Sequence, residues 1–195
     1  MKRRSFMGLL GLGSFLGSFL GSFLVTSVGV TKNAPASPSG KIDHRLKELG
    51  ITLPEPPAPM AAYVPYRKVG NLVYIAGQGP IHSNETPGFG RVGHDLTTKQ
   101  GYNAARTVGY NILAQLKKAC DGDLDRVVQA IQIQGIVQCT DDYRDSPKVI
   151  NGASELFREV FGDSGLAARA AIGTNALPMN IACEILSIFE IRART

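Results

Sequence analysis

The stretch from residue 166 to residue 190, LAARAAIGTNALPMNIACEILSIFE, places Arg169 and Glu184 in two otherwise apolar runs. Both runs have the length and composition of strands, and the turn-forming sequence NALPMN separates them. The pattern predicts two strands joined as a hairpin that ends the fold. Charges are uncommon in such strands unless they serve a partner or a ligand, so these two residues also bear on function.

The sequence before this stretch alternates between the periodicities of strands and helices. Two strand-like runs, YVPYRKV and LVYIAG, flank Gly70 and Asn71, which predicts a first hairpin. From Thr97 the spacing becomes helical, and Thr97 with Gln100 forms a capping-box pattern at the start of that helix. The apolar positions of this helix recur on one side: Ala105, Val108, Ile112 and Leu116.

A long strand and a second helix follow. The run RVVQAIQIQGIVQC, residues 126–139, alternates large apolar residues with glutamine, as a strand with one polar face does. Ser146 and Pro147 begin a helix that Gly162 ends. The order of hairpin, helix, strand, helix and hairpin predicts an α+β fold, a mixed sheet with two helices packed on one face. The other face has no cover, which predicts a homo-oligomer.

The two charges of the last hairpin have different surroundings when alternate residues of a strand are assigned to one side. Glu184 shares its side with Leu186, where a carboxylate is partly desolvated. Arg169 shares its side with Ala171 and Gly173, small residues that leave room for a ligand. Arg169 could therefore hold an acidic small molecule through its fork of donors, while Glu184, across the hairpin, handles a proton. Residue types alone leave open a structural ion pair between the two.

The first 36 residues have the composition of an export signal. They contain no acidic residue and four basic ones, Lys2, Arg3, Arg4 and Lys32. The opening KRRSFM is similar to a twin-arginine (Tat) signal, and Ala34-Pro35-Ala36 offers a cleavage site. We therefore expect export to the periplasm. The alternative is an uncleaved N-terminal anchor, because the uncharged stretch in this segment is long enough to cross a bilayer.

The remaining chain is divided into a lead-in arm, residues 37–60, and a domain, residues 61–195. The arm holds a short helical pattern, KIDHRLKELG, followed by the proline-rich ITLPEPPAPM, which favours an extended course along the surface. Removing residues 1–36 changes the formal net charge from +5 to +5 − 4 = +1, so we expect no nucleic-acid partner. The three cysteines and three histidines lack metal-ligand spacing, so we expect buried thiols and no metal.

From about Tyr63 to Arg192 the chain resembles the RidA (YjgF-type) family of reactive intermediate deaminases, whose members also carry the description endoribonuclease L-PSP. The family signature is an arginine in an A-R-S-type strand, then L-P, then a strand with an acid. Ala168-Arg169-Ala170, Leu177-Pro178 and Glu184 match this signature in order. Further agreement comes from Tyr63, from Gly77-Gln78 and from the helix that bears Asn151.

The resemblance implies a chorismate-mutase-like fold that assembles as a homotrimer, with clefts between subunits and no cofactor. The implied reaction is hydrolysis of enamine or imine acids, such as 2-aminoacrylate or 2-iminobutanoate, to 2-keto acids and ammonia. Arg169 would bind the substrate carboxylate and Glu184 would activate a water, with Tyr63, Gly77 and Asn151 lining the cleft.

Two positions depart from the family pattern. Ala76 stands where well-studied members have a serine, and Ala171 stands where they have a cysteine. Each change removes a polar group from the implied cleft, so turnover and substrate choice stay open. Two alternatives therefore remain beside the deaminase: an exported trimeric module that binds small carboxylates without turnover, and a ribonuclease of the L-PSP type.

Overall fold

The computed structural model describes residues 40–80 and 88–193, which belong to a compact unit spanning Ala36–Thr195. The predicted export signal, residues 1–36, lies outside the described residues. Within the described part, no helix combines the length and the hydropathy that a membrane crossing needs.

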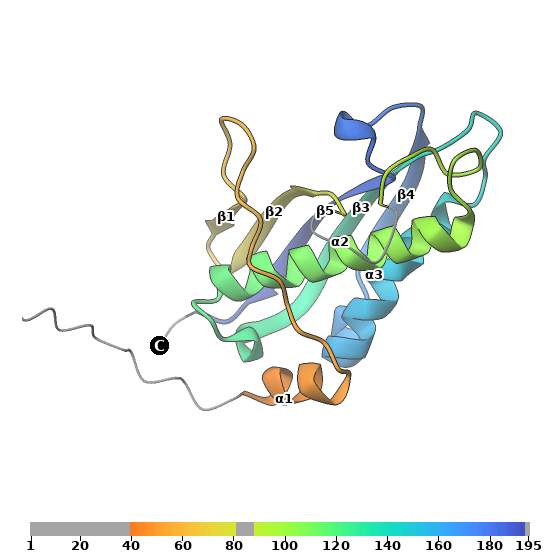
Figure 1. Ribbon diagram of the computed structural model, residues 1–195. Coiled ribbons are helices and arrows are strands. Elements are labelled where there is room, and N and C mark those ends of the chain that lie inside the picture. The colour runs from red at the N-terminus through yellow and green to blue at the C-terminus, as the bar shows by residue number, and fades with distance from the viewer. Residues whose placement is uncertain (1–39, 81–87, 194–195) are drawn as a thin grey trace, which may run out of the picture. The chain divides into compact units, whose positions relative to one another are not determined.

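A single five-stranded sheet forms the centre of this unit (Figure 1). Its strands are β1 (Tyr66–Val69), β2 (Leu72–Gln78), β3 (Val127–Gln138), β4 (Ala168–Thr174) and β5 (Cys183–Ile191). Their order across the sheet is β1-β2-β5-β3-β4. Only the β3–β4 pair is parallel, whereas β1–β2, β2–β5 and β5–β3 are antiparallel. The predicted α+β fold with a mixed sheet is confirmed.

Two long helices, α2 (Thr98–Ala119) and α3 (Ser146–Phe161), lie side by side on one face of the sheet (Figure 1). Helix α2 begins with the predicted capping box: the Thr97 N–H donates to Gln100 Oε1 at 2.8 Å, and the Gln100 N–H donates to Thr97 Oγ1 at 3.2 Å. Helix α3 has Pro147 in its first turn and ends at Gly162, whose φ of 66° favours glycine. The predicted apolar stripe of α2 is buried, and so is the inner side of α3.

The core lies between these helices and the inner face of the sheet. Its largest aromatic contact joins Phe157 of α3 to Phe189 of β5, whose ring centroids are 5.5 Å apart at an interplanar angle of 81°. This edge-to-face geometry is a favoured one for two aromatic rings, and both side chains are fully buried. The contact therefore fixes the packing of α3 over the middle of the sheet.

The predicted final hairpin is wrong, because β4 and β5 do not pair with each other. Strand β4 runs parallel to β3 after the α3 crossover, while β5 enters the sheet between β3 and β2. The side chains explain this order. In strand β5, large buried residues such as Ile185 and Phe189 alternate with more exposed ones, and the centre of the sheet is where such residues are covered. The alanine-rich β4 is mostly exposed and lies at the edge.

The arm is tied to the rest of the unit at both its helix and its proline-rich segment. Helix α1 (Lys41–Glu48) buries Leu46 in the common core. The carboxylate of Asp125 accepts hydrogen bonds at 2.7 Å from the backbone N–H groups of Lys41 and Ile42, so it caps this helix from a distant part of the chain. The residues after α1 cross the C-terminal half of α2 on their way to β1 (Figure 1).

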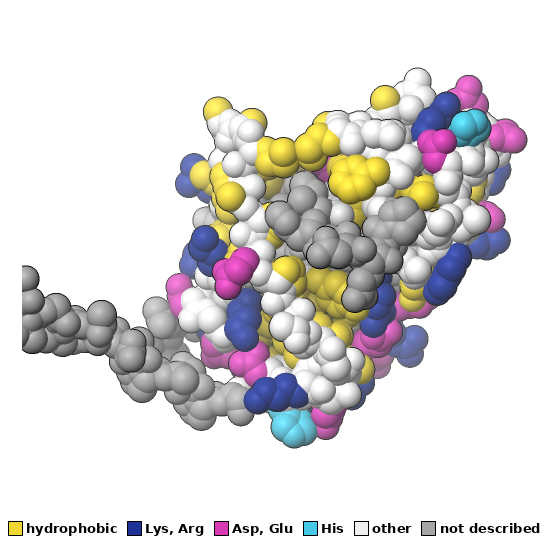
Figure 2. Space-filling view, viewed as in Figure 1, with side chains coloured by type: hydrophobic (Ala, Val, Ile, Leu, Met, Phe, Trp, Pro, Cys, Tyr) yellow, Lys and Arg dark blue, Asp and Glu magenta, His cyan; other side chains and the backbone are white. Residues whose placement is uncertain are grey.

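The side of the unit shown in Figure 2 carries basic and acidic side chains that alternate over the surface. Ion pairs among the described residues include Arg106 with Glu159 and Lys117 with Asp43. Mixed charges of this kind do not form the continuous basic stripe that tracks a nucleic-acid backbone.

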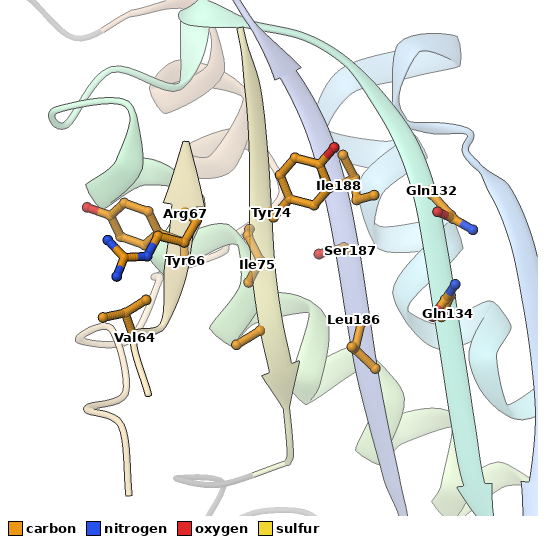
Figure 3. Close-up of a pocket in the computed structure, with 11 residues that line it drawn as sticks. Val64, Tyr66, Arg67, Tyr74, Ile75, Gln132, Gln134, Leu186, Ser187 and Ile188 are labelled. Carbon is orange, nitrogen blue, oxygen red and sulfur yellow. The ribbon is translucent and has the colours of Figure 1, made fainter. Parts of the chain in front are cut away.

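None of the described helices covers the opposite face of the sheet. Figure 3 shows Tyr74, Leu186, Ile188, Gln132 and Gln134 on this face, with the helices behind the strands. They border a depression of about 380 Å³. Several apolar side chains that remain exposed lie here, among them Tyr74 at 42% and Ile172 at 57% exposure. We name this surface the open face.

Candidate functional site

Arg169 lies on edge strand β4 and reaches toward α3. In the parallel register it is the partner of Ile133, a buried residue on the helix-covered side of β3. Its Nη1 donates to Asn151 Oδ1 at 2.7 Å and to Ser154 Oγ at 3.1 Å. Asn151 and Ser154 lie three residues apart on α3, which places both acceptors on one side of that helix. The structure therefore brings together two of the predicted site residues, Arg169 and Asn151.

The guanidinium of Arg169 keeps its charge available. Both of its acceptors are neutral, and within the described residues no ion pair includes Arg169. The side chain is exposed, and its Nε and Nη2 donors make no hydrogen bond to the described part of the chain. An exposed arginine oriented by neutral groups, with free donors, can bind a carboxylate through two hydrogen bonds.

Glu184 lies on the other side of the sheet. Its antiparallel partner is Ile136 of β3, whereas the neighbouring Gly135 packs under Ile150 of α3 on the helix side. The alternation of strands therefore places Glu184 on the open face. No ion pair in the described residues includes it, so the structural ion pair between Arg169 and Glu184 is excluded within one chain.

The carboxylate of Glu184 rests against the backbone of Gly77. A Cβ at position 77 would overlap Glu184 Oε1, so only glycine leaves room for the carboxylate there. The ladder between β2 and β5 is irregular between Ile75 and Gln78, as it is at a β-bulge. Gly77 is therefore not just a turn residue, because it gives Glu184 its place.

Tyr63 lies beside the same glycine, across a narrow crevice. The crevice has a volume of about 30 Å³, and its walls are the arm residues 57–60 with Tyr63 on one side and residues 77–79 on the other. The Tyr63 hydroxyl accepts a hydrogen bond from the Met60 N–H at 3.3 Å, and the Tyr63 side chain is 46% exposed. Tyr63 and Glu184 therefore both lie beside Gly77.

The predicted site residues thus fall into two groups, which we name the arginine half-site (Arg169, Asn151 and Ser154) and the glutamate half-site (Glu184, Gly77 and Tyr63). Strand β3 lies between β4 and β5, and the half-sites are on opposite faces of the sheet. The expectation that Glu184 faces Arg169 across a hairpin is therefore wrong. One chain alone does not bring the two charges into a common site.

The two alanines that depart from the family pattern lie beside the half-sites. Ala171 follows Arg169 on the same side of β4 and pairs in register with Gly135. Ala76 directly precedes Gly77, and its N–H donates to the Pro65 carbonyl at 3.0 Å. Neither methyl group can hydrogen-bond a ligand, so recognition falls to the backbone and to the residues of the half-sites.

Two supporting residues were not predicted from the sequence. Ser154 shares the orientation of Arg169 with Asn151, and the spacing of three residues on α3 was a signal that could have identified it. Gln138 is buried and holds the turn before β5: its Nε2 donates to Asn180 Oδ1 at 2.5 Å, and its Oε1 accepts from the Leu177 N–H at 2.6 Å. No local pattern indicates that long-range contact.

The thiol next to Glu184 is not a nucleophile. Cys183 is fully buried, and burial together with the smaller effect of the Glu184 charge raises the pKa of its thiol to about 12. Burial likewise raises the pKa of Cys120 to about 11. The prediction of buried thiols is confirmed, since all three cysteines are free and buried.

Comparison with known proteins gives the family. Residues 43–191 match the model described as "YjgF/chorismate mutase-like, putative endoribonuclease". The chain belongs to this family. The resemblance to RidA (YjgF-type) proteins that the sequence showed is thereby confirmed.

Three relatives of this YjgF-type chain share most of its length. Protein TCP17 of Trypanosoma cruzi is 35% identical, and the match covers 78% of this chain and 96% of that protein. The crystal structure of Atu1372 from Agrobacterium tumefaciens is 43% identical with a TM-score of 0.71, covering 77% of this chain and 92% of that one. A Shewanella oneidensis structure with an endoribonuclease description is 33% identical with a TM-score of 0.73, covering 78% and 100%.

Proposed function

We propose that the protein hydrolyses small enamine or imine acids, such as 2-aminoacrylate or 2-iminobutanoate, to 2-keto acids and ammonia. One observation carries the proposal: Arg169 is exposed, oriented by Asn151 and Ser154, and has no acidic partner in the described residues. Many structural arginines pair with an acid of their own chain. A guanidinium that is oriented by neutral groups and lacks an acidic partner is suited to bind a ligand that contains a carboxylate.

Two copies of the chain would be needed for one complete site. The half-sites lie on opposite faces of the sheet, so the arginine half-site of one copy would have to meet the glutamate half-site of the next. The open face offers apolar surface for such an assembly, including Tyr74, Leu186 and Ile172. A homotrimer, the assembly implied by the family resemblance, would repeat this contact three times and leave no copy unmatched.

The proposed reaction needs only a proton acceptor and a carboxylate anchor. Arg169 binds the substrate carboxylate and sets the imine carbon in place. A water oxygen attacks that carbon while Glu184 takes one water proton and passes it to the imine nitrogen, so that a neutral carbinolamine forms. Glu184 then takes the carbinolamine hydroxyl proton and gives it to the amino nitrogen, the C–N bond breaks as the C=O double bond forms, and ammonia and the 2-keto acid leave.

The test compares two substitutions in the full-length chain. Arg169→Ala should lose both carboxylate affinity and turnover, whereas Glu184→Gln keeps its shape and should lose turnover with binding preserved. The assay measures ammonia and 2-keto acid released from 2-iminobutanoate generated in place, after subtraction of the rate in buffer alone. Carboxylate binding without release above that rate would contradict hydrolysis and favour the binding module.

The ribonuclease alternative has its own discriminating measurement. It rests on the description of the family and of the Shewanella relative. Cleavage of RNA that depends on Glu184, together with binding that weakens steeply with salt, would support it against the hydrolase.

A further inference from the structure

Helix α2 carries two buried amide side chains on its otherwise apolar inner side. Asn111 and Gln115 are each 1% exposed and lie one helical turn apart. Both donate to backbone carbonyls outside the helix: Asn111 Nδ2 to the Gly79 carbonyl at 2.9 Å, and Gln115 Nε2 to the Pro57 carbonyl at 2.6 Å. The helix thus holds two chain segments that are far apart in the sequence.

These two carbonyls belong to the two walls of the crevice beside Tyr63. Pro57 lies on the arm side and Gly79 on the side of Gly77, and both residues line the crevice. Gly77, only two residues before Gly79, is the residue on which the Glu184 carboxylate rests. The amide pair therefore connects both walls of the crevice to one rigid helix.

Tyr63 depends on these attachments for its place. Every residue from 58 to 64 is exposed, and the hydrogen bonds that this stretch makes with described residues are local, such as the one from the Tyr63 N–H to the Ala61 carbonyl at 2.8 Å. The next attachment after Pro57 is Pro65, whose carbonyl accepts from the Ala76 N–H at 3.0 Å. The loop that carries Tyr63 is thus fixed at its two ends, and Gln115 supplies the first of them.

The buried amide of Gln115 lowers the stability of the fold, and packing alone does not explain why a glutamine occupies this position. Its Oε1 is buried and has no hydrogen-bond partner among the described residues. An unsatisfied buried acceptor lowers stability, and a methionine of similar shape would avoid that loss. The one hydrogen bond that Gln115 does make, to Pro57, is therefore the contribution that distinguishes glutamine from an apolar residue here.

We infer that Asn111 and Gln115 are positioning residues: they set the width of the crevice and so place Tyr63 opposite Gly77, the residue against which the Glu184 carboxylate packs. The catalytic consequence rests on the proposed function, whereas the structural consequence does not. The pair acts on the loop through backbone carbonyls, so it is independent of which side chains the loop carries.

The test uses Gln115→Met in the full-length chain, with Leu113→Val as a matched control. Leu113 is also buried in α2, but it lies on the opposite side of the helix, so its shortening lowers stability without freeing Pro57. Hydrogen exchange of the backbone amides in residues 58–64 should be about tenfold faster in Gln115→Met and unchanged in Leu113→Val. Equal exchange in wild type and Gln115→Met would overturn the inference.

A second measurement links the pair to turnover. Gln115→Met should lower kcat/KM by about as much as Tyr63→Phe. The double variant should have the same kcat/KM as either single variant, because each of the three variants loses the correctly placed Tyr63 hydroxyl. Additive losses would contradict a positioning role. Should Gln115→Met fail to fold, Gln115→Asn takes its place, since the shorter amide keeps its polarity but does not reach Pro57.

The two proposals can fail separately. A wild-type chain that releases no ammonia above the buffer rate removes the proposed function, yet hydrogen exchange still decides whether Gln115 holds the arm. A chain that hydrolyses imines, but whose loop exchange and kcat/KM are the same in wild type and Gln115→Met, keeps the function and loses the positioning pair.

Discussion

Mixing two inactive variants should restore part of the activity. Arg169→Ala destroys the arginine half-site of its chain and leaves the glutamate half-site intact, while Glu184→Gln does the reverse. Because the two half-sites lie on opposite faces of the sheet, the proposed site combines one half from each of two copies. A site between a Glu184→Gln chain and an Arg169→Ala chain, in the correct order, therefore contains both wild-type charges.

The size of the recovery follows from counting. In an equal mixture that exchanges subunits at random, a site receives an intact Arg169 in half of the cases and an intact Glu184 in half of the cases. About one quarter of the sites should then be complete, so the mixture should reach about one quarter of the wild-type rate per site. Two charges that acted within one chain would give no recovery at all.

The assay is release of 2-keto acid from 2-iminobutanoate, measured before and after the two purified variants are allowed to exchange subunits. Wild-type protein taken through the same exchange controls for losses in handling. A second control mixes Arg169→Ala with a chain that carries both substitutions, which supplies no intact arginine and should stay inactive. A mixture that never exceeds the sum of its components, although subunits exchange, would refute a site shared between copies.

Three further outcomes are expected from the geometry. Gly77→Ala should abolish most turnover while the chain stays folded, because the new methyl group displaces the Glu184 carboxylate; kcat and the thermal midpoint, measured together, check this. The raised pKa values of Cys183 and Cys120, about 12 and about 11 against an ordinary 9.0, mean that the folded chain binds these protons more tightly than the unfolded chain. The free energy of unfolding should therefore be insensitive to these thiols below about pH 9 and should fall as the pH rises from there toward 12, which urea titrations of wild type and Cys183→Ala would test. Thr97→Ala should cost about 1 kcal/mol through loss of the α2 cap, and Thr97→Ser, which keeps the hydroxyl, should recover most of it in the same titrations.

Much of the fold follows from local patterns. Both long helices, their first turns and their buried stripes are local properties of 16 to 22 consecutive residues, so the sequence determines them without knowledge of the rest. The first hairpin is equally local, because Gly70 has the positive φ that a tight turn requires. The strand order is a different kind of property. Whether β5 pairs with β4 or crosses β3 depends on burial across the whole sheet, and no short pattern contains that information.

In the candidate site, too, some features follow from local sequence and others depend on tertiary contacts. Arg169, Glu184, Tyr63, Gly77 and Asn151 were identified from residue types and family resemblance, and the structure places them in two clusters. Which face each charge occupies could not be predicted, because a change of one residue in strand register moves a side chain to the other face of the sheet. The amides on α2 also escaped prediction, since a buried glutamine differs from a surface glutamine only in its tertiary contacts.

The position of β4 at the edge of the sheet gives Arg169 a second effect. The backbone of an edge strand has unpaired N–H and C=O groups, which can add a strand from another molecule. Strand β4 has the sequence ARAAIGT, and Arg169 is its only charged residue. Without it, the strand would be a short, uncharged, apolar edge, the kind of segment that templates cross-β aggregation. The arginine proposed to bind the ligand is therefore also expected to protect the solubility of the folded chain.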